Sequence, residues 1–473
     1  MVVSIFKTKP IASLIAETEG KQGLKKALGA TDLTLLGIGA VIGTGIFVLT
    51  GVAAANYSGP ALIISFILSG LACFFAALCY AEFSSTVPVA GSAYTYSYAA
   101  LGEIWAWIIG WDLILEYAVA ISAVAIGWSG YAVTLLSSIG IDLPKAITSA
   151  PLDGGVVNLP AMIIIALISW LLISGIRQTS NLNGIIVAIK LIVIALFIVL
   201  AVWHIKPANW HPFMPFGFNG VVSGAAVIFF AYIGFDAVST AAEETRNPQK
   251  NLPRGILFSL LICTALYIVV SGILTGVVKY TAFKHTSAPV AFALQQIGIN
   301  WGSALVSVGA ICGITSVLLV ITYGQTRIFF AMARDGLIPK LFGKVSEKHQ
   351  TPVTSTLLVA VVTIITAGFL PIGIVAELAN IGTLFAFVIV AIGIIVLRIR
   401  KPELKRGFRT PWVPVVPILA VLSCLYLIIH LQAATLIRFV VWFAIGMVVY
   451  FLYSRRHSAL QQGVVSSGQE KVE

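Results

Sequence analysis

Apolar residues along this chain form long runs that short polar segments separate. A helix of about 20 apolar residues is long enough to cross the hydrocarbon core of a bilayer. Runs of about this length predict twelve membrane-spanning helices, near 31–55, 60–82, 102–137, 159–175, 182–204, 220–242, 253–278, 301–333, 352–371, 373–398, 413–432 and 434–453. The third and eighth runs are longer, which indicates tilt or extension beyond the lipid. The pattern therefore predicts an all-α polytopic membrane protein.

Composition agrees with this interpretation, and the positions of the charges orient the chain. Of the 473 residues, 59% are hydrophobic and only 10% are charged. A net charge of +11 would also suit a nucleic-acid partner, but Lys and Arg fall in alternate inter-helix segments, as the positive-inside rule describes. We therefore expect no nucleic acid, a multi-pass protein of the cell membrane, and both termini in the cytoplasm. The predicted cytoplasmic residues are Lys7, Lys9, Lys21, Lys25, Lys26, Arg177, Arg246, Lys250, Arg254, Arg334, Lys340, Lys344, Lys348, Arg398, Arg400, Lys401, Lys405, Arg406, Arg409, Arg455 and Arg456.

The predicted helices divide into two blocks of similar length. Five helices occupy 31–204 and five more lie within 205–398. Because each block holds an odd number of crossings, the second must be inverted relative to the first, which is typical of secondary transporters. The expected organisation is a cytoplasmic segment 1–30, repeats 31–204 and 205–398, helices 11 and 12 in 399–453, and a cytoplasmic tail 454–473.

The first predicted helix contains the glycine-rich stretch "GIGAVIGTGIF", residues 37–47. Each glycine inside a helix weakens it by about 1 kcal/mol relative to alanine. A dinucleotide fingerprint would need a soluble βαβ unit, which the apolar surroundings disfavour. Close helix packing through Gly39 and Gly43 stays open, and so does a break in the helix around Gly43, Thr44 and Gly45.

A broken membrane helix frees backbone N–H and C=O groups that lipid cannot satisfy. The freed N–H groups suit a carboxylate and the freed carbonyls suit an ammonium, so one break can hold both ends of a free amino acid. The sixth predicted helix has a comparable stretch, "FFAYIGFDAVSTAAEE", in which Gly234 precedes Asp236. We expect that a bulky residue at Gly45 abolishes binding and that Gly37 tolerates alanine.

Charged side chains inside predicted helices are costly and therefore indicate function. Lys190 lies in the middle of the fifth helix, where desolvation disfavours its charged form, so it is a candidate for proton coupling. A structural ammonium held by helix-end carbonyls, or a lysine that reaches the lipid interface, are the alternatives. Glu116, with Asp112 four residues before it, and Asp236 are the candidate acids, or they close a buried hydrogen-bond network.

Groups for metal or cofactor chemistry do not form a pattern in the sequence. The five cysteines lie in apolar runs and the six histidines are scattered. We expect no metal, no cofactor and no enzymatic activity, since no nucleophile–base set is apparent.

Taken together, five stretches resemble bacterial members of the cationic amino acid transporter family, within the amino acid–polyamine–organocation superfamily. They are "GIGAVIGTGIF", "YAEFSSTVPVAGSAYTYSYAALGE", "GWDLILEY", "FFAYIGFDAVSTAAEETRNPQKNLPRGI" and "YGQTRIFFAMARDGLIP". The similarity extends over about residues 20–455. It implies the leucine-transporter fold, with two inverted five-helix repeats, two further helices, and breaks in helices one and six.

The resemblance also implies roles for particular residues. The substrate carboxylate would meet the backbone of Gly43, Thr44, Gly45 and Ile46, and the ammonium would meet carbonyls near Ile42, Phe230, Ala231 and Ile233. Proton coupling would involve Lys190, near Gly43, Thr315 and Ser316, with Glu116 as an inner acid.

The bulky, apolar Ile321 is expected beside the substrate side chain. The function we predict is proton-coupled symport of small or medium neutral amino acids such as alanine, with cationic amino acids also open. An exchanger without net ion coupling is the alternative, and a channel or sensor is disfavoured because polar groups gather at mid-membrane. The expected partners are a free amino acid, the proton and the bilayer, with room for a small membrane subunit.

Overall fold

The computed structural model describes residues 5–11, 14, 27–89, 92–174, 180–346 and 351–462, and their regular structure is helical apart from two isolated bridges. Eight helical stretches are long and apolar enough to cross a membrane: Gly45–Thr86, Glu103–Ser138, Gly184–His204, Gly217–Thr240, Pro248–Val277, Asn300–Arg334, Ile372–Arg400 and Ala433–His457. Four apolar helices are shorter: Ala30–Val41, Leu159–Ile173, Val353–Phe369 and Val415–Ile428. An all-helical membrane architecture is therefore confirmed.

Apart from the short α19, the following α-helices fall where the apolar runs predict them. They are α2 (Ala30–Val41), α3 (Thr50–Ala53), α4 (Leu62–Thr86), α6 (Glu103–Ser138), α8 (Leu159–Ile173), α9 (Ser180–Ala201), α10 (Gly217–Ile228), α11 (Ala237–Thr240), α12 (Pro248–Val277), α14 (Asn300–Arg334), α15 (Val353–Phe369), α16 (Ile372–Arg400), α17 (Val415–Ile428), α18 (Ala433–Val449) and α19 (Arg455–His457). The third and eighth runs give the long helices α6 and α14. The pattern missed α5 (Ser92–Ala100), α7 (Lys145–Thr148) and α13 (Pro289–Gln296), which are too short to produce an apolar run of spanning length.

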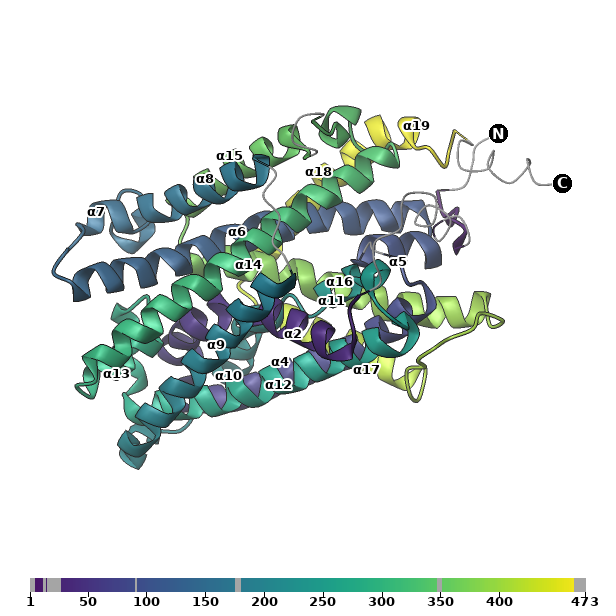
Figure 1. The fold of residues 1–473 in the computed structure, drawn as a ribbon. Helices are drawn as coiled ribbons and strands as arrows, with labels where there is room; N and C mark the ends of the chain where they lie inside the picture. The colour runs from purple at the N-terminus through teal and green to yellow at the C-terminus, as the bar shows by residue number, and fades with distance from the viewer. Residues whose placement is uncertain are drawn as a thin grey trace.

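The long helices lie side by side in one bundle (Figure 1). α7 and α13 lie at one end of the bundle, and α5 and α19 lie at the other. In the interior α4 packs against α12, and α6 packs against both α14 and α16. Apolar side chains on the outside are exposed, such as Ile192 on α9 (65%) and Val440 on α18 (66%), which suits a surface that faces lipid.

The end of the bundle that carries α5 and α19 is tied together by buried ion pairs. Lys9 Nζ lies 3.2 Å from Asp335 Oδ1, close to the end of α14. Glu82 on α4 accepts from Arg398 Nη2 at 2.7 Å, and Arg406 Nε lies 3.2 Å from its other oxygen. Ser458 donates to Glu103, so segments near both ends of the chain meet here. We refer to this region as the basic end.

Some predictions fall on residues outside the described ranges. The tail beyond Gln462 is one of them. The others are the orienting charges Lys21, Lys25, Lys26, Arg177 and Lys348.

Candidate functional site

The first predicted helix is interrupted where its second pair of glycines lies. α2 ends at Val41, and Ile42 is extended, with φ −76° and ψ 102°. The helix resumes as a five-residue π-helical turn, Gly45–Leu49, followed by α3. Thr44 already has helical dihedral angles, φ −55° and ψ −29°, so the break lies at Ile42 and Gly43 and overlaps the predicted position.

The sixth predicted helix is interrupted too. α10 ends at Ile228, a 3-10 turn covers Phe229–Tyr232, and Ile233 is extended, with φ −60° and ψ 131°. Gly234 follows with φ +114°, a conformation that L side chains rarely adopt, so this position requires glycine. The short helix α11 then begins at Ala237.

The two breaks touch each other through backbone atoms. A Cβ atom at Gly45 would lie 2.2 Å from Ala231 Cα, and one at Gly234 would lie 2.9 Å from the carbonyl oxygen of Ala40. The bare glycines therefore allow the two interrupted helices to cross at contact distance. Gly37 is also tightly packed, because a Cβ there would lie 2.4 Å from Ser259 Oγ and 2.6 Å from Ser259 Cβ on α12. The expectation that Gly37 tolerates alanine is wrong, because no space exists for the methyl group.

Side chains from other helices satisfy carbonyls near the breaks. In a continuous helix the Gly39 carbonyl would accept from the N–H of Gly43. Here it accepts instead from Lys190 Nζ at 2.6 Å. The hydroxyl of Tyr267 lies 3.0 Å from the Val41 carbonyl oxygen and 2.8 Å from that of Ala231.

The amide of Asn380 on α16 donates to two carbonyls at the end of α10. Its Nδ2 lies 2.7 Å from the Ala226 oxygen and 2.9 Å from the Val227 oxygen. The sequence reasoning missed both Tyr267 and Asn380. A polar side chain in the middle of an apolar run, which needs a buried partner, is the signal that would have found them.

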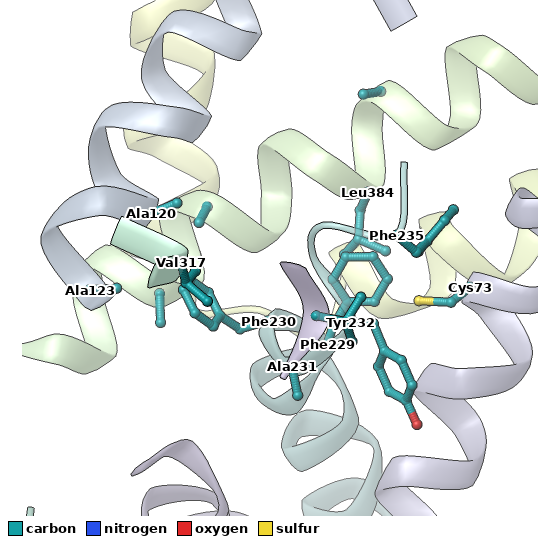
Figure 2. Packing of buried hydrophobic residues seen from close by; sticks show 14 of the residues in the cluster. Cys73, Ala120, Ala123, Phe229, Phe230, Ala231, Tyr232, Phe235, Val317 and Leu384 are labelled. Carbon is teal, nitrogen blue, oxygen red and sulfur yellow. The ribbon is translucent and has the colours of Figure 1, made fainter. Parts of the chain in front are cut away.

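A small cavity of about 20 Å³ lies between the breaks, and α6 and α14 close it from the other side. The side chains in its walls are apolar except for that of Thr44, and the lining residues are Ala40, Val41, Gly43, Thr44, Gly45, Ala120, Val124, Phe230, Ile233, Val317 and Ile321. Figure 2 shows Phe230 beside Val317, whereas Tyr232, two residues later, is directed to the other side of the turn. The volume holds about one water molecule, so a larger solute requires the walls to move apart.

Six of the predicted substrate residues line this cavity: Gly43, Thr44, Gly45, Phe230, Ile233 and Ile321. The other three, Ile42, Ile46 and Ala231, are buried in the packing around it. The Thr44 hydroxyl is buried and has no hydrogen-bond partner within the described part of the chain. Among the described residues that line the cavity, only Thr44 has a polar side chain.

Lys190 is wholly buried and packs against α14, where a Cβ at Gly313 would lie 2.9 Å from its Cγ. The two hydroxyls predicted beside it have other hydrogen-bond partners. Ser316 donates to the Gly313 carbonyl at 2.9 Å, and Thr315 donates to Ile311 at 2.7 Å. Thr315 also accepts from Trp128 on α6 at 2.9 Å.

The predicted acids form a separate group on α6. Asp112 and Glu116 are buried against α16, where a Cβ at Gly382 would lie 3.0 Å from Asp112 Oδ1. Within the described residues, both Asp112 carboxyl oxygens and Glu116 Oε2 lack a hydrogen-bond partner. No ion pair joins these acids to Lys190 in the same part of the chain. Asp236 lies at the second break, where its carbonyl accepts from Ser239 at 2.6 Å.

Together, the architecture and site define a class: an all-helical membrane protein with a small apolar cavity between two interrupted helices. Comparison with known proteins places the chain within that class. The family described as "Amino acid permease" matches residues 28–454. The chain therefore belongs to the amino acid permease family.

Individual relatives cover almost the whole chain. It is 54% identical to the "Branched-chain amino acid permease BcaP" of Bacillus subtilis (strain 168), over 97% of this chain and 99% of the relative. It is 52% identical to the "Methylthioribose transporter" of the same organism, over 97% and 100%. A "Branched-chain amino acid permease BcaP" of Lactococcus lactis is 37% identical, over 91% and 95%.

More distant relatives carry the family name that the sequence suggested. An Arabidopsis thaliana protein named "Cationic amino acid transporter 4, vacuolar" is 31% identical over 98% of this chain. The predicted resemblance is thus confirmed. Membership in a permease family is also consistent with the expectation that the protein is not an enzyme.

Proposed function

We propose that this protein imports neutral aliphatic amino acids by alternating access, with the proton as coupling ion. The observation that carries the proposal is the apolar cavity between two helix breaks, because each break offers backbone groups to a charged solute end. The cavity is smaller than an amino acid, so its walls must move apart to admit a substrate.

The two charged ends of the substrate would be held by backbone. The N–H groups of Gly43, Thr44, Gly45 and Ile46 start the second half of the interrupted helix, where the dipole favours a carboxylate. Carbonyls near Ile42, Phe230, Ala231 and Ile233 would accept from the ammonium. The unpaired Thr44 hydroxyl can donate to the carboxylate as well.

The cavity wall supports an apolar substrate side chain. Its side chains come from Ala, Val, Ile, Phe and Thr, and none of its residues is charged. An arginine or lysine substrate would bury its cationic end there without a partner, which is costly. Two relatives are named as branched-chain amino acid permeases, which supports valine, leucine and isoleucine as substrates. Alanine would contact the same lining with fewer atoms.

Lys190 is the group that we assign to proton coupling, with Glu116 as a second proton site and Thr315 and Ser316 in the adjoining wall of α14. The ammonium form of Lys190 makes a charge-assisted hydrogen bond to the Gly39 carbonyl, in the last turn before the first break. Loss of the Lys190 proton would weaken that bond and loosen the attachment of α2 to α9. Protonation would therefore favour the arrangement in which α2 is held against α9. A structural ammonium, bound permanently to that carbonyl, is the alternative.

For the membrane arrangement, we propose twelve crossings, with two inverted five-helix repeats and both termini in the cytoplasm of a cell-membrane protein. The eight long and four short apolar helices supply the segments for this count. The basic end, where Lys9, Arg398 and Arg406 form ion pairs, would face the cytoplasm because positive charge is retained there.

The relative named as a methylthioribose transporter supports a second candidate, a thioether sugar. Its hydroxyls would need several polar partners, whereas Thr44 provides the polar side chain of the cavity wall. The apolar lining therefore favours an amino acid over a sugar.

Thermal unfolding of the purified protein with single solutes tests the substrate class. A ligand that binds the native state raises the melting temperature in proportion to the logarithm of its concentration above Kd. We expect shifts with leucine, isoleucine and valine, smaller ones with alanine, and none with lysine. A shift with methylthioribose and none with any amino acid would contradict the proposal.

A further inference from the structure

Tyr267 connects the two helix breaks from outside the cavity. It lies in α12 and is fully buried. Its ring packs against Tyr232, with the ring centres 5.4 Å apart, and against Phe66 on α4 at 5.2 Å. These contacts fix where its hydroxyl lies.

The Tyr267 hydroxyl faces two carbonyls, one from each interrupted helix. The distances are 3.0 Å to the Val41 oxygen and 2.8 Å to the Ala231 oxygen. In uninterrupted helices these carbonyls would accept from the N–H groups of Gly45 and Phe235. The breaks remove those N–H donors, and the Tyr267 hydroxyl lies within hydrogen-bond distance of both carbonyls instead.

A tyrosine hydroxyl carries a single proton and can donate to one carbonyl at a time. The other carbonyl then lacks this donor, and an unsatisfied buried carbonyl costs about 1–3 kcal/mol. An ammonium that enters the cavity brings three N–H donors. Val41 lines the cavity and Ala231 touches Gly45 in its wall, so the carbonyl that lacks the tyrosine proton is next to the place where the ammonium would bind.

We propose that Tyr267 is a positioning residue for the ammonium of the substrate. Its hydroxyl ties the Val41 and Ala231 carbonyls together and satisfies one of them, which leaves the other directed at the amino group. This proposal rests on the proposed function and assigns to α12 a role that no cavity-lining residue performs.

The proposal predicts a selective loss when the hydroxyl is removed. Tyr267→Phe keeps the ring packing and releases both carbonyls, so the site for the ammonium loosens while the apolar side-chain site stays intact. The control is Tyr232→Phe, which also loses one buried hydroxyl bond, 2.8 Å to the Phe66 carbonyl, in the same aromatic group.

The experiment measures inhibition of leucine uptake in proteoliposomes by three compounds. Leucine and leucinamide carry the ammonium, and 4-methylpentanoate lacks it. For Tyr267→Phe we expect at least tenfold weaker inhibition by leucine and leucinamide, and less than twofold change for 4-methylpentanoate. For Tyr232→Phe we expect all three to change by the same factor.

Other outcomes overturn the proposal. An equal loss for all three compounds in Tyr267→Phe would indicate a merely structural hydroxyl, and tighter leucine binding would show that the hydroxyl competes with the substrate. If Tyr267→Phe does not fold, Tyr267 is replaced with 4-aminophenylalanine, whose amine has two N–H donors and can satisfy both carbonyls. This variant must restore folding and weaken inhibition by leucine and leucinamide relative to 4-methylpentanoate, and an unchanged preference for the two ammonium compounds also overturns the proposal. If the wild-type protein does not bind leucine, both the proposed function and the tyrosine proposal fail. If the wild-type protein binds leucine and Tyr267→Phe does not change the inhibition by leucine and leucinamide relative to 4-methylpentanoate, only the tyrosine proposal fails.

Discussion

In both interrupted helices, side chains from other helices donate hydrogen bonds to backbone carbonyls near the break, but the side chains differ. Beside the first break, a carbonyl is satisfied by the potentially charged Lys190 from α9. Beside the second, two carbonyls are satisfied by the neutral amide of Asn380 from α16. Tyr267 stands between them and faces one carbonyl of each.

The hydrogen bond beside the first break can therefore vary with protonation, whereas the hydrogen bonds beside the second break cannot. The strength of the bond at Lys190 depends on whether the amine carries a proton, whereas the amide of Asn380 does not titrate. If Lys190 is the coupling group, loss of its proton would loosen the first helix, and the second helix would be the constant partner against which the first one moves.

The contact between the breaks should be the most sensitive feature of the molecule. Gly45→Ala puts a Cβ 2.2 Å from Ala231 Cα, and because that neighbour is backbone, no rotamer change relieves the clash. We expect loss of uptake to background and a large fall in melting temperature. Gly184→Ala is the matched control, since no atom lies within 4 Å of its added Cβ, and normal uptake by Gly45→Ala would refute the crossing of the two helices.

Replacement of Lys190 should separate binding from coupling. Lys190→Met fills the same buried space without a titratable group, so leucine should still raise the melting temperature while accumulation driven by a proton gradient falls at least tenfold. Wild-type uptake should rise as the outside is acidified, and the variant should show a flat pH profile. Lys279→Met, an exposed lysine beyond the end of α12, is the control. A variant that keeps the pH response would show that Lys190 is a structural ammonium.

Removal of the Asn380 amide should weaken transport without changing its pH dependence. Asn380→Leu preserves the approximate volume and removes the amide donor from the Ala226 and Val227 carbonyls, of which Val227 keeps the bond from the Phe229 N–H. A buried carbonyl that is left unsatisfied costs about 1–3 kcal/mol. We expect a lower melting temperature and a severalfold lower maximal rate, with the wild-type pH profile. A pH profile that flattens as in Lys190→Met would remove the distinction between the two breaks.

A smaller effect is expected at Gly37, which lies away from the cavity. Overpacking of a core position typically costs about 1–3 kcal/mol. Gly37→Ala should lower the melting temperature while leucine affinity changes less than twofold. Adding Ser259→Gly removes both atoms within 2.6 Å and should recover part of the loss. No recovery in the double variant would contradict the packing between α2 and α12.

The sequence was sufficient for the long apolar helices and for the places where two of them break, but it did not predict the short helices α5, α7 and α13. Apolar runs of spanning length locate helices directly, and glycines in a membrane helix mark the weak points, as at Gly43, Gly45 and Gly234. The partners of the breaks were harder, because they come from α12 and α16, distant in sequence. Tyr267 and Asn380 are ordinary residues in apolar runs, and only the packing of the bundle reveals which carbonyls they reach. The prediction that Gly37 tolerates alanine was wrong for the same reason, since its neighbour Ser259 belongs to another helix.

Leucine accumulation by the purified protein in liposomes, with and without an inward proton gradient, tests the central claim most directly. We predict accumulation above the external concentration with the gradient and simple equilibration without it, with lysine ineffective as a competitor. Equal accumulation under both conditions, or exchange of internal for external leucine that ignores the gradient, would contradict proton coupling. No leucine uptake under either condition would contradict the proposed substrate.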